Sequence, residues 1–258
     1  MKKRIIPSIL LESGSTNACL SQEFSPWRTV GTLAQQLKLH VSRGCDELLI
    51  INPQSSFNGL LPFSDRISKL IVNNTDIPVA YSGGIRDSAT ASECINKCFD
   101  KVFLTSSFLD SPKILSEIAS IVGVQSVGVC LPYRCIGESS NRFVWDFGRR
   151  ECLTKKPLQY YIQKVFECGA GEILLYSVDR DGTLNGLDEQ ILPLLQSCDL
   201  SRPVLLGGGA GKPEHFVNVL RSELVQGVVA SSIFSLTQET PSTLRGFCLE
   251  DGIPMRKA

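Results

Sequence analysis

Three short motifs recur in this chain at one fixed spacing. The run 47–50 (ELLI) returns as 172–175 (EILL), the pair Gly83-Gly84 returns as Gly208-Gly209, and the pair at 106–107 returns as Ser231-Ser232. The offset is 125 residues each time, since 172 minus 47, 208 minus 83 and 231 minus 106 agree. A shared offset over three motifs indicates an internal repeat. The 258 residues are therefore expected to form two similar halves.

Short β-branched runs alternate with amphipathic helical patterns along the whole chain. Eight runs are expected to be strands: 4–10, 47–52, 79–82, 101–105, 126–131, 172–178, 204–206 and 227–231. This alternation is typical of a parallel sheet. Eight units in two halves predict an α/β fold, a closed (β/α)₈ TIM barrel formed from two half-barrels, rather than an open doubly wound sheet. Residues 1–258 are expected to be this one domain, with a β-hairpin or loop at 135–156 above the fifth strand.

The charge balance and the hydropathy of the chain limit which partners and which cellular location are expected for the protein. The chain has 26 basic and 26 acidic side chains, so neither nucleic acid nor a membrane surface is expected as a partner. No stretch approaches the roughly 20 apolar residues of a membrane-spanning helix. The basic start is followed by an apolar run, 5–11, that is too short for a signal peptide and is interrupted by Pro7. A cytoplasmic protein is expected.

Ten cysteines raise the question of disulfides and metals. In a chain without a signal peptide, with cysteines inside apolar patterns, reduced and mostly buried thiols are the better interpretation. Cys94 and Cys98 could share one helix face, but no second pair at metal-ligand spacing accompanies them, and the histidines are His40 and His215. Neither a metal nor another cofactor is expected.

Glycine-rich turns follow several predicted strands, at the end where such barrels carry their function. Each half has a turn set: residues 82–84 with 105–107 in the first, and 207–212 with 230–232 in the second. Glycines alone can simply make tight turns, but duplicated sets favour phosphate binding by backbone N–H groups. Two sites across one mouth suit a ligand with a phosphate at each end. The candidate phosphate-binding residues are Gly83, Gly84, Thr105, Ser106, Gly208, Gly209, Ala210, Ser231 and Ser232.

Asp181 lies in the segment 179–183 (DRDGT), directly after the sixth predicted strand. A carboxylate there can accept hydrogen bonds from ligand hydroxyls or move protons. An Asp-Gly turn with a purely structural capping role is the other interpretation. The residues alone leave both open.

Four charged residues stand at the starts of predicted strands, at the opposite end of the barrel: Arg4, Glu47, Lys101 and Glu172. Two positive and two negative side chains could close a salt-bridged ring across the barrel. Such a ring is either a structural plug or a gate, and the pattern does not choose between them.

Together these motifs resemble the cyclase subunit of imidazole glycerol phosphate synthase. The resemblance covers the whole chain and is strongest in the segments 169–175 (GAGEILL), 179–183 (DRDGT) and 208–216 (GGAGKPEHF). It implies a glutaminase docked at the amino ends of the strands, and ammonia that passes through the barrel to a bis-phosphorylated ribulosyl substrate. It further implies that the charged ring is the ammonia gate and that Asp100 lies at the glutaminase interface.

The resemblance fails at the acid–base pair. The family places one aspartate near the end of the first strand and another at the end of the fifth, and these positions are Leu10 and Pro132 here. Neither side chain can transfer a proton. The family's acid on the second strand is Asn52, whereas Asp181 remains as a tentative catalytic residue.

A second branch of the family, the sugar-amidation accessory subunit of surface-polysaccharide synthesis, is more similar in the run 6–11 (IPSILL) and also has leucine at the first position. At the second position, the end of the fifth strand, Pro132 differs from the residue of that branch as well.

Three hypotheses follow. The first is an accessory barrel that works with a glutaminase and supplies ammonia for sugar amidation. The second is an imidazole glycerol phosphate synthase cyclase of histidine biosynthesis, a lyase, that uses Asp181 or water in place of the lost pair. The third is a solitary phosphate-binding isomerase barrel. The same two lost aspartates and the ring at the barrel bottom count against the third hypothesis.

Overall fold

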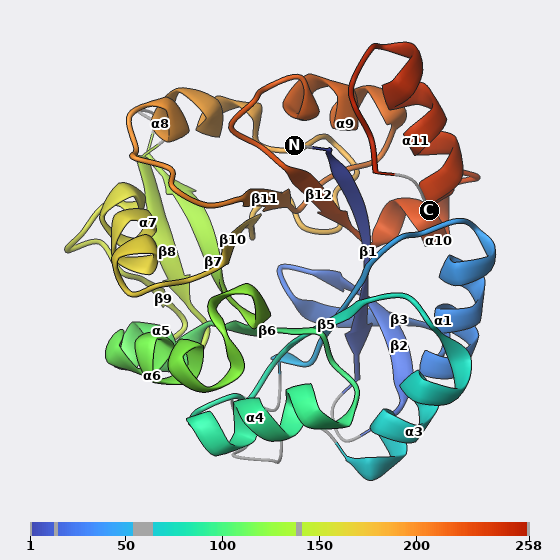
Figure 1. Ribbon diagram of the computed structural model, residues 1–258. Coiled ribbons are helices and arrows are strands. Elements are labelled where there is room, and N and C mark those ends of the chain that lie inside the picture. Colours follow the sequence, from blue (N-terminus) through green and yellow to red (C-terminus); the bar gives the residue numbers. More distant parts are fainter. Residues whose placement is uncertain (1, 13–14, 54–63, 138–140, 257–258) are drawn as a thin grey trace.

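Eight parallel strands form a closed barrel in the computed structural model, which describes residues 2–12, 15–53, 64–137 and 141–256 (Figure 1). The barrel strands, in chain order, are β1 (Arg4–Leu11), β4 (Leu48–Ile51), β5 (Val79–Ser82), β6 (Lys101–Leu104), β7 (Val127–Ile136), β10 (Glu172–Ser177), β11 (Val204–Gly207) and β12 (Gly227–Ala230). Each is hydrogen-bonded to the next, and β12 returns to β1, with Arg4 opposite Gly227. The predicted (β/α)₈ barrel is confirmed.

Helices alternate with these strands and cover the outside of the barrel. They are α1 (Leu33–Ser42), α3 (Asp65–Asn74), α4 (Ser88–Lys97), α5 (Ser106–Asp110), α6 (Lys113–Val122), α7 (Leu158–Glu167), α8 (Leu192–Gln196), α9 (Pro213–Leu220), α10 (Ser232–Leu236) and α11 (Pro241–Glu250), with 3₁₀ turns at Val124–Ser126 and Glu189–Ile191. The helix starts are encoded locally: the Asp87 side chain, for example, accepts a hydrogen bond from the Thr90 N–H at the first turn of α4. Among the described residues, none of the helices is long and apolar enough to cross a membrane.

The repeat is visible as matching elements in the two halves. The first glycine pair follows β5 and the second follows β11, and both pairs have positive φ angles. The serine pairs lie at the starts of two helices of equal length: the first pair begins α5 after β6, and Ser231 is the N-cap and Ser232 the first residue of α10 after β12. The two half-barrels are thus matched at the ends of their strands, where the sequence placed the candidate phosphate turns.

Alternate residues of each strand point to opposite faces, and both faces are buried. Ile5 and Leu48 belong to the core between the strands and the helices. Their neighbours Ile6 and Leu49 belong to a separate apolar core inside the barrel. The barrel is filled with side chains for most of its length, as in other barrels of this size.

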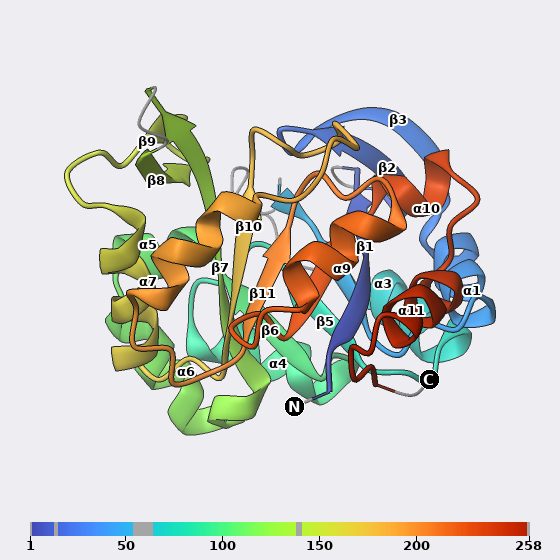
Figure 2. The same ribbon diagram turned by 90° about the horizontal axis from the view of Figure 1, so that it is seen from above.

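Two hairpins extend the sheet beyond the barrel. β2 (Asn17–Gln22) and β3 (Ser25–Thr32) form one, and β8 (Asn141–Asp146) with β9 (Glu151–Cys152) continues antiparallel from the end of β7. Figure 2 shows both at the same end of the barrel, opposite the chain termini. The hairpin predicted within 135–156 is confirmed, although β7 runs to Ile136, beyond the predicted strand end at 131. The hairpin at 17–32 was not predicted.

All ten cysteines are free thiols. Five are buried, four are partly buried and Cys135 is exposed. Cys98 is the C-cap of α4 rather than a residue of its helical body, so it does not share a regular helix face with Cys94. The described residues contain no group of three or more His, Cys, Asp and Glu that could hold a metal ion.

Candidate functional site

Charged side chains meet across the amino end of the barrel. Arg4 donates a hydrogen bond to Glu47 over 2.9 Å and forms an ion pair with Glu172, whose other carboxylate oxygen accepts from Lys101 Nζ at 2.7 Å. The Glu172 side chain is 2% exposed. Burial disfavours the charged form of Arg4, but the two carboxylates outweigh burial and raise its pKa. The predicted ring is a connected network, called the amino-end ring below, although Glu47 immediately precedes β4 instead of starting it.

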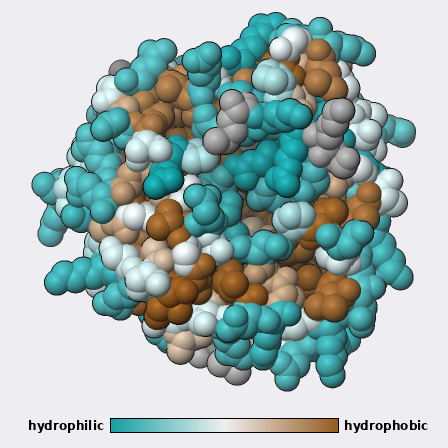
Figure 3. Space-filling model, viewed as in Figure 1, coloured by the Kyte–Doolittle hydropathy of each residue, from teal (hydrophilic) through white to brown (hydrophobic). Residues whose placement is uncertain are grey.

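The surface around the amino-end ring is polar at its centre and apolar towards the rim. Figure 3 views the molecule from the side of the chain termini and shows hydrophilic residues in the middle with hydrophobic patches around them. Arg256 lies 3.7 Å from Glu47 at this end. Asp100, the predicted interface residue, is exposed, and its carboxylate accepts a hydrogen bond from the Val79 N–H at 2.9 Å. This bond gives Asp100 a structural role at the start of β5.

The opposite end of the barrel, the mouth, contains a cavity of about 470 Å³ beside the first turn set. Gly83 and Gly84 follow β5 with φ angles of 145° and 66°. A Cβ atom at Gly83 would lie 2.2 Å from the Asn52 carbonyl oxygen, so the close approach of the two chains requires glycine. Thr105 and Ser106, at the start of α5, line the same cavity.

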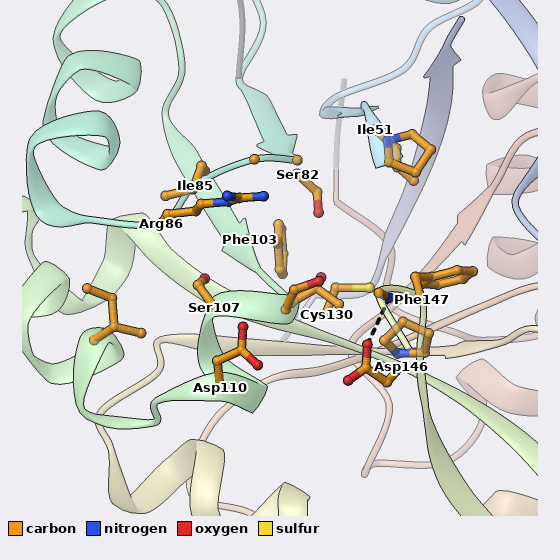
Figure 4. A pocket seen from close by; sticks show the side chains of 18 of the residues that line it. Ile51, Ser82, Ile85, Arg86, Phe103, Ser107, Asp110, Cys130, Asp146 and Phe147 are labelled. Atoms are coloured by element: carbon orange, nitrogen blue, oxygen red, sulfur yellow. Dashed lines mark hydrogen bonds between the residues drawn. The ribbon is translucent and has the colours of Figure 1, made fainter. Parts of the chain in front are cut away.

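Apolar side chains form much of the cavity wall, and the charged residues Arg86, Asp110, Glu117, Asp146 and Arg149 also line it. Figure 4 shows Phe103, Ile51 and Cys130 on the wall, with Arg86 and Asp110 on the side of the turn set. Burial raises the pKa of the Cys130 thiol to about 12, so it stays protonated at neutral pH. The hydroxyl oxygen of Ser107 is buried and has no hydrogen-bond partner among the described residues. The cavity therefore combines the glycine turn that was predicted to bind phosphate, an unsatisfied hydroxyl and an apolar wall.

The second turn set encloses far less space. Only about 10 Å³ lies between its lining residues, which are Tyr176, Asp181, Gly182, Leu184, Gly208, Gly209, Ala210, Ala230, Ser231 and Ser232. The segment that follows β10 packs directly on the turn: the Gly186 N–H donates to the Gly209 carbonyl at 2.8 Å, and a Cβ at Gly211 would lie 2.1 Å from the Leu184 carbonyl oxygen. The two repeated turn sets are thus unequal in the folded chain.

Both oxygens of the Asp181 carboxylate are occupied by other groups. One accepts from the Tyr176 hydroxyl at 2.7 Å, and the other accepts from the Ser21 hydroxyl at 2.7 Å and the Phe24 N–H at 2.9 Å. Burial raises the pKa of Asp181, and these three hydrogen bonds oppose that shift. Burial and the Asp181 charge raise the pKa of Tyr176 well above its usual value. In this arrangement Asp181 anchors the β2–β3 hairpin.

Phe24 inserts its ring into the mouth from the tip of that hairpin. The ring centroid lies 4.5 Å from that of Tyr176 and 4.9 Å from that of Phe147, which follows β8. Glu23 and Phe24 both have positive φ, at 52° and 60°, which is unfavourable for residues other than glycine and asparagine. Arg134 of β7 forms ion pairs with Glu23 and with Asp179. Contacts from three barrel segments therefore hold the strained tip in place.

Residues 4–240 match the sequence model of the family described as "Histidine biosynthesis protein". The chain belongs to this family. It is 31% identical to the protein named imidazole glycerol phosphate synthase subunit HisF in Pyrococcus furiosus, over 99% of each chain. It is also 31% identical to the HisF subunits of Thermococcus gammatolerans, over 99% of this chain and 98% of the relative, and of Caulobacter vibrioides, over 99% and 96%.

In this HisF-family barrel, the two positions expected to carry the acid–base pair have apolar side chains. Leu10 is buried in the core inside the barrel, and Pro132 lines the large cavity. Asp181, the predicted catalytic residue, lies at the mouth. Its carboxylate oxygens accept hydrogen bonds from Ser21, Phe24 and Tyr176, and its catalytic role stays a prediction.

Three contributors to the mouth were missed from the sequence: Phe24, Tyr176 and the segment 146–149, which begins at the last residue of β8. A weak signal existed for Phe24, since a large apolar residue stands there in an otherwise polar segment.

Proposed function

We propose that this HisF-family barrel is an ammonia-conducting accessory subunit that works with a glutaminase to amidate a sugar in surface-polysaccharide synthesis. One observation carries the proposal: ion pairs link all four residues of the amino-end ring, whereas the mouth has Leu10 and Pro132 where a cyclase needs proton-transfer groups. The chain retains what passage of ammonia requires and lacks what cyclisation requires.

The interior of the barrel suits the passage of a small neutral molecule. Between the amino-end ring and the mouth, the inner core is apolar and includes Ile6, Leu49, Ala80, Leu174 and Val229. Ammonia in its uncharged form can enter such a region, whereas ammonium would have to lose its hydration at a high cost in free energy. The ring is therefore the place where access from a docked glutaminase would be controlled.

The rim of the amino end offers apolar area for a protein partner. Val72, Ile121 and Leu249 are 63%, 58% and 53% exposed and lie in the last turns of α3, α6 and α11. In a (β/α)₈ barrel the helices run antiparallel to the strands, so these last turns surround the amino end of the barrel. Apolar side chains around a charged centre are typical of a protein interface, and this is where the glutaminase is proposed to dock.

The alternative is a cyclase subunit of imidazole glycerol phosphate synthase. The names of the relatives, at 31% identity, and the presence of both turn sets and Asp181 favour it. Because each general acid or base contributes about 10²–10⁴-fold, the loss of the pair favours the accessory role instead.

Complex formation tests the proposal. Each glutaminase subunit encoded in the same organism would be purified and titrated with the barrel by calorimetry, and one is expected to form a one-to-one complex. Ile121→Glu or Leu249→Glu is expected to weaken this binding about tenfold or more, since each places a charge in the apolar rim. Trp27→Glu is the matched control, because Trp27 is 50% exposed but lies on the hairpin at the other end. Binding by none of the glutaminases, or equal weakening by the control, would contradict the proposal.

A further inference from the structure

A groove lies at the mouth end of the barrel, between the tip of the β2–β3 hairpin and the segment that follows β10 (Figure 2). Its volume is about 440 Å³. None of the residues of the two turn sets lines it, and it shares no lining residue with the large cavity. The described residues that line this space, called the hairpin groove below, are Gln22, Glu23, Ser25, Pro26, Trp27, Asp179, Asp181 and Thr183.

Trp27 gives the hairpin groove an aromatic platform. Its side chain is 50% exposed, whereas tryptophan is on average a well buried residue. Pro26 precedes it in β3 and is exposed as well. An exposed indole face beside polar groups suits the C–H face of a saturated ring, because the ring buries apolar surface there while its polar substituents point to the sides.

Hydrogen-bonding groups line the same groove. Gln22, Ser25 and Thr183 are exposed, and their amide and hydroxyl groups can each donate and accept. Glu23 and Asp179, whose side chains are 56% and 33% exposed, add carboxylate oxygens that accept from hydroxyl groups. The groove can therefore satisfy a ligand that carries several hydroxyl groups around one ring.

The charge of the groove disfavours an anionic ligand, because its described lining includes three carboxylates and no basic side chain. Arg134, which does not line the groove, forms ion pairs with Glu23 and Asp179, and three donors hold Asp181. The carboxylates thus already have partners within the protein and keep lone pairs for hydroxyl donors. The same contacts fix the hairpin tip, so the groove is formed before a ligand binds.

We propose that the hairpin groove binds an uncharged sugar, with the C–H face of one pyranose ring on Trp27 and its hydroxyl groups on Gln22, Glu23 and Thr183. A sugar bound there is held at the end of the barrel where ammonia is proposed to leave. In identifying this sugar with the acceptor of amidation, and only in that, the inference rests on the proposed function.

Ligand-observed NMR titration of the purified chain tests the inference with neutral probes, the methyl β-glycosides of glucose, galactose and N-acetylglucosamine. At least one is expected to bind with a Kd of about 1 mM, as a small ligand in an open groove should. Methyl β-glucuronide, the same ring as the glucoside with a carboxylate, is expected to bind at least about fivefold more weakly, since it meets like charges. No binding of the three neutral probes up to about 50 mM would overturn the inference.

A cationic probe separates a sugar site from a cation site. Choline offers a quaternary ammonium group that Trp27 and the carboxylates could attract, but it has one hydroxyl group. It is expected to bind more weakly than the preferred glycoside. Tighter binding of choline than of every glycoside would make the groove a cation site and would overturn the inference.

The indole N–H resonance of Trp27 locates the site. The chain has two tryptophans, Trp27 and Trp145, so a ¹⁵N-labelled sample shows two such resonances, which Trp27→Phe assigns. The preferred glycoside is expected to shift the resonance of Trp27 at concentrations that match its Kd. Binding without a shift at Trp27 would place the sugar elsewhere and contradict the proposed site.

Two variants and one control measure the contribution of the platform. Trp27→Ala is expected to weaken glycoside binding about tenfold or more, and Trp27→Phe, which keeps an aromatic face, by less than about threefold. Tyr160→Ala is the control, because Tyr160 is 43% exposed on α7 and does not line the groove. An equal loss in the control, or no loss in Trp27→Ala, would remove the role of Trp27.

Failure here can be told apart from failure of the proposed function. A glutaminase complex without sugar binding would remove only this inference. Sugar binding without any glutaminase complex would remove only the accessory role.

Discussion

Replacement of Arg142 by alanine is expected to lower the free energy of unfolding by about 3–5 kcal/mol, the cost of leaving a buried charge without its partner. Arg142 of β8 donates from Nε and Nη2 to the two carboxylate oxygens of Asp188, at 2.7 and 2.8 Å. Asp188 is 3% exposed, and the Tyr133 hydroxyl donates to it at 3.0 Å. Arg142→Ala leaves the Asp188 carboxylate inside the protein with one neutral donor in place of a cation.

Urea denaturation of the variant and the parent chain measures this cost. Arg149→Ala is the matched control on the segment after β8, because its ion pairs with Asp110 and Asp146 are 3.5 Å long and its side chain is 54% exposed. The control is expected to change stability by less than about 1 kcal/mol. A loss below about 1 kcal/mol for Arg142→Ala would show that this ion pair does not hold the β7–β8 hairpin over the mouth.

The second large effect is expected at the amino-end ring. In the complete amidating complex, Lys101→Met should reduce the rate with glutamine as nitrogen donor about tenfold or more, a difference in activation free energy of about 1.4 kcal/mol. Lys101 is 18% exposed and holds one oxygen of the buried Glu172, so its removal disturbs the ring through which ammonia is proposed to pass. The rate with ammonium salt, which supplies ammonia at the mouth directly, should change by less than about twofold.

The comparison of the two nitrogen sources separates a gate from a structural plug. Lys97→Met makes the same chemical change on α4, in the exposed ion pairs with Asp65 and Glu93, and is expected to affect neither rate. Binding of inorganic phosphate to Lys101→Met should also match the parent chain. Equal losses with glutamine and with ammonium salt would mean that Lys101 supports the fold and does not control ammonia.

The barrel could be predicted from the sequence because its information is local and repeated. Each strand is a short apolar run, and each helix has a periodic apolar face, so the alternation is visible without knowledge of tertiary contacts. The common offset of the repeat then favoured a closed barrel of two halves over an open doubly wound sheet. The same argument located the amino-end ring, because the first residue of each strand in a parallel barrel lies at the same end.

The mouth was harder to predict because it depends on contacts between distant segments. The β2–β3 hairpin turns at Glu23 and Phe24, a pair with no glycine or asparagine, so the sequence carries no usual turn signal. Its conformation is imposed by Asp181 and Tyr176, some 150 residues later in the chain.

The inequality of the two turn sets has a similar origin. The glycine motifs are alike, and the segment at 179–186 packs on the second set; the matching positions in the first half, 54–61, lie outside the described residues. Repetition of a motif predicts its backbone, whereas the space beside it is decided by the loops around it.

The measurement that tests the central claim most directly is turnover of the bis-phosphorylated ribulosyl substrate by the purified barrel with ammonium salt, at a pH that supplies free ammonia. The HisF subunit of Pyrococcus furiosus, assayed beside it, serves as the positive control. The account predicts no turnover by this chain, because Leu10 and Pro132 cannot transfer protons. Turnover approaching that of the control would contradict the account and establish the chain as a cyclase.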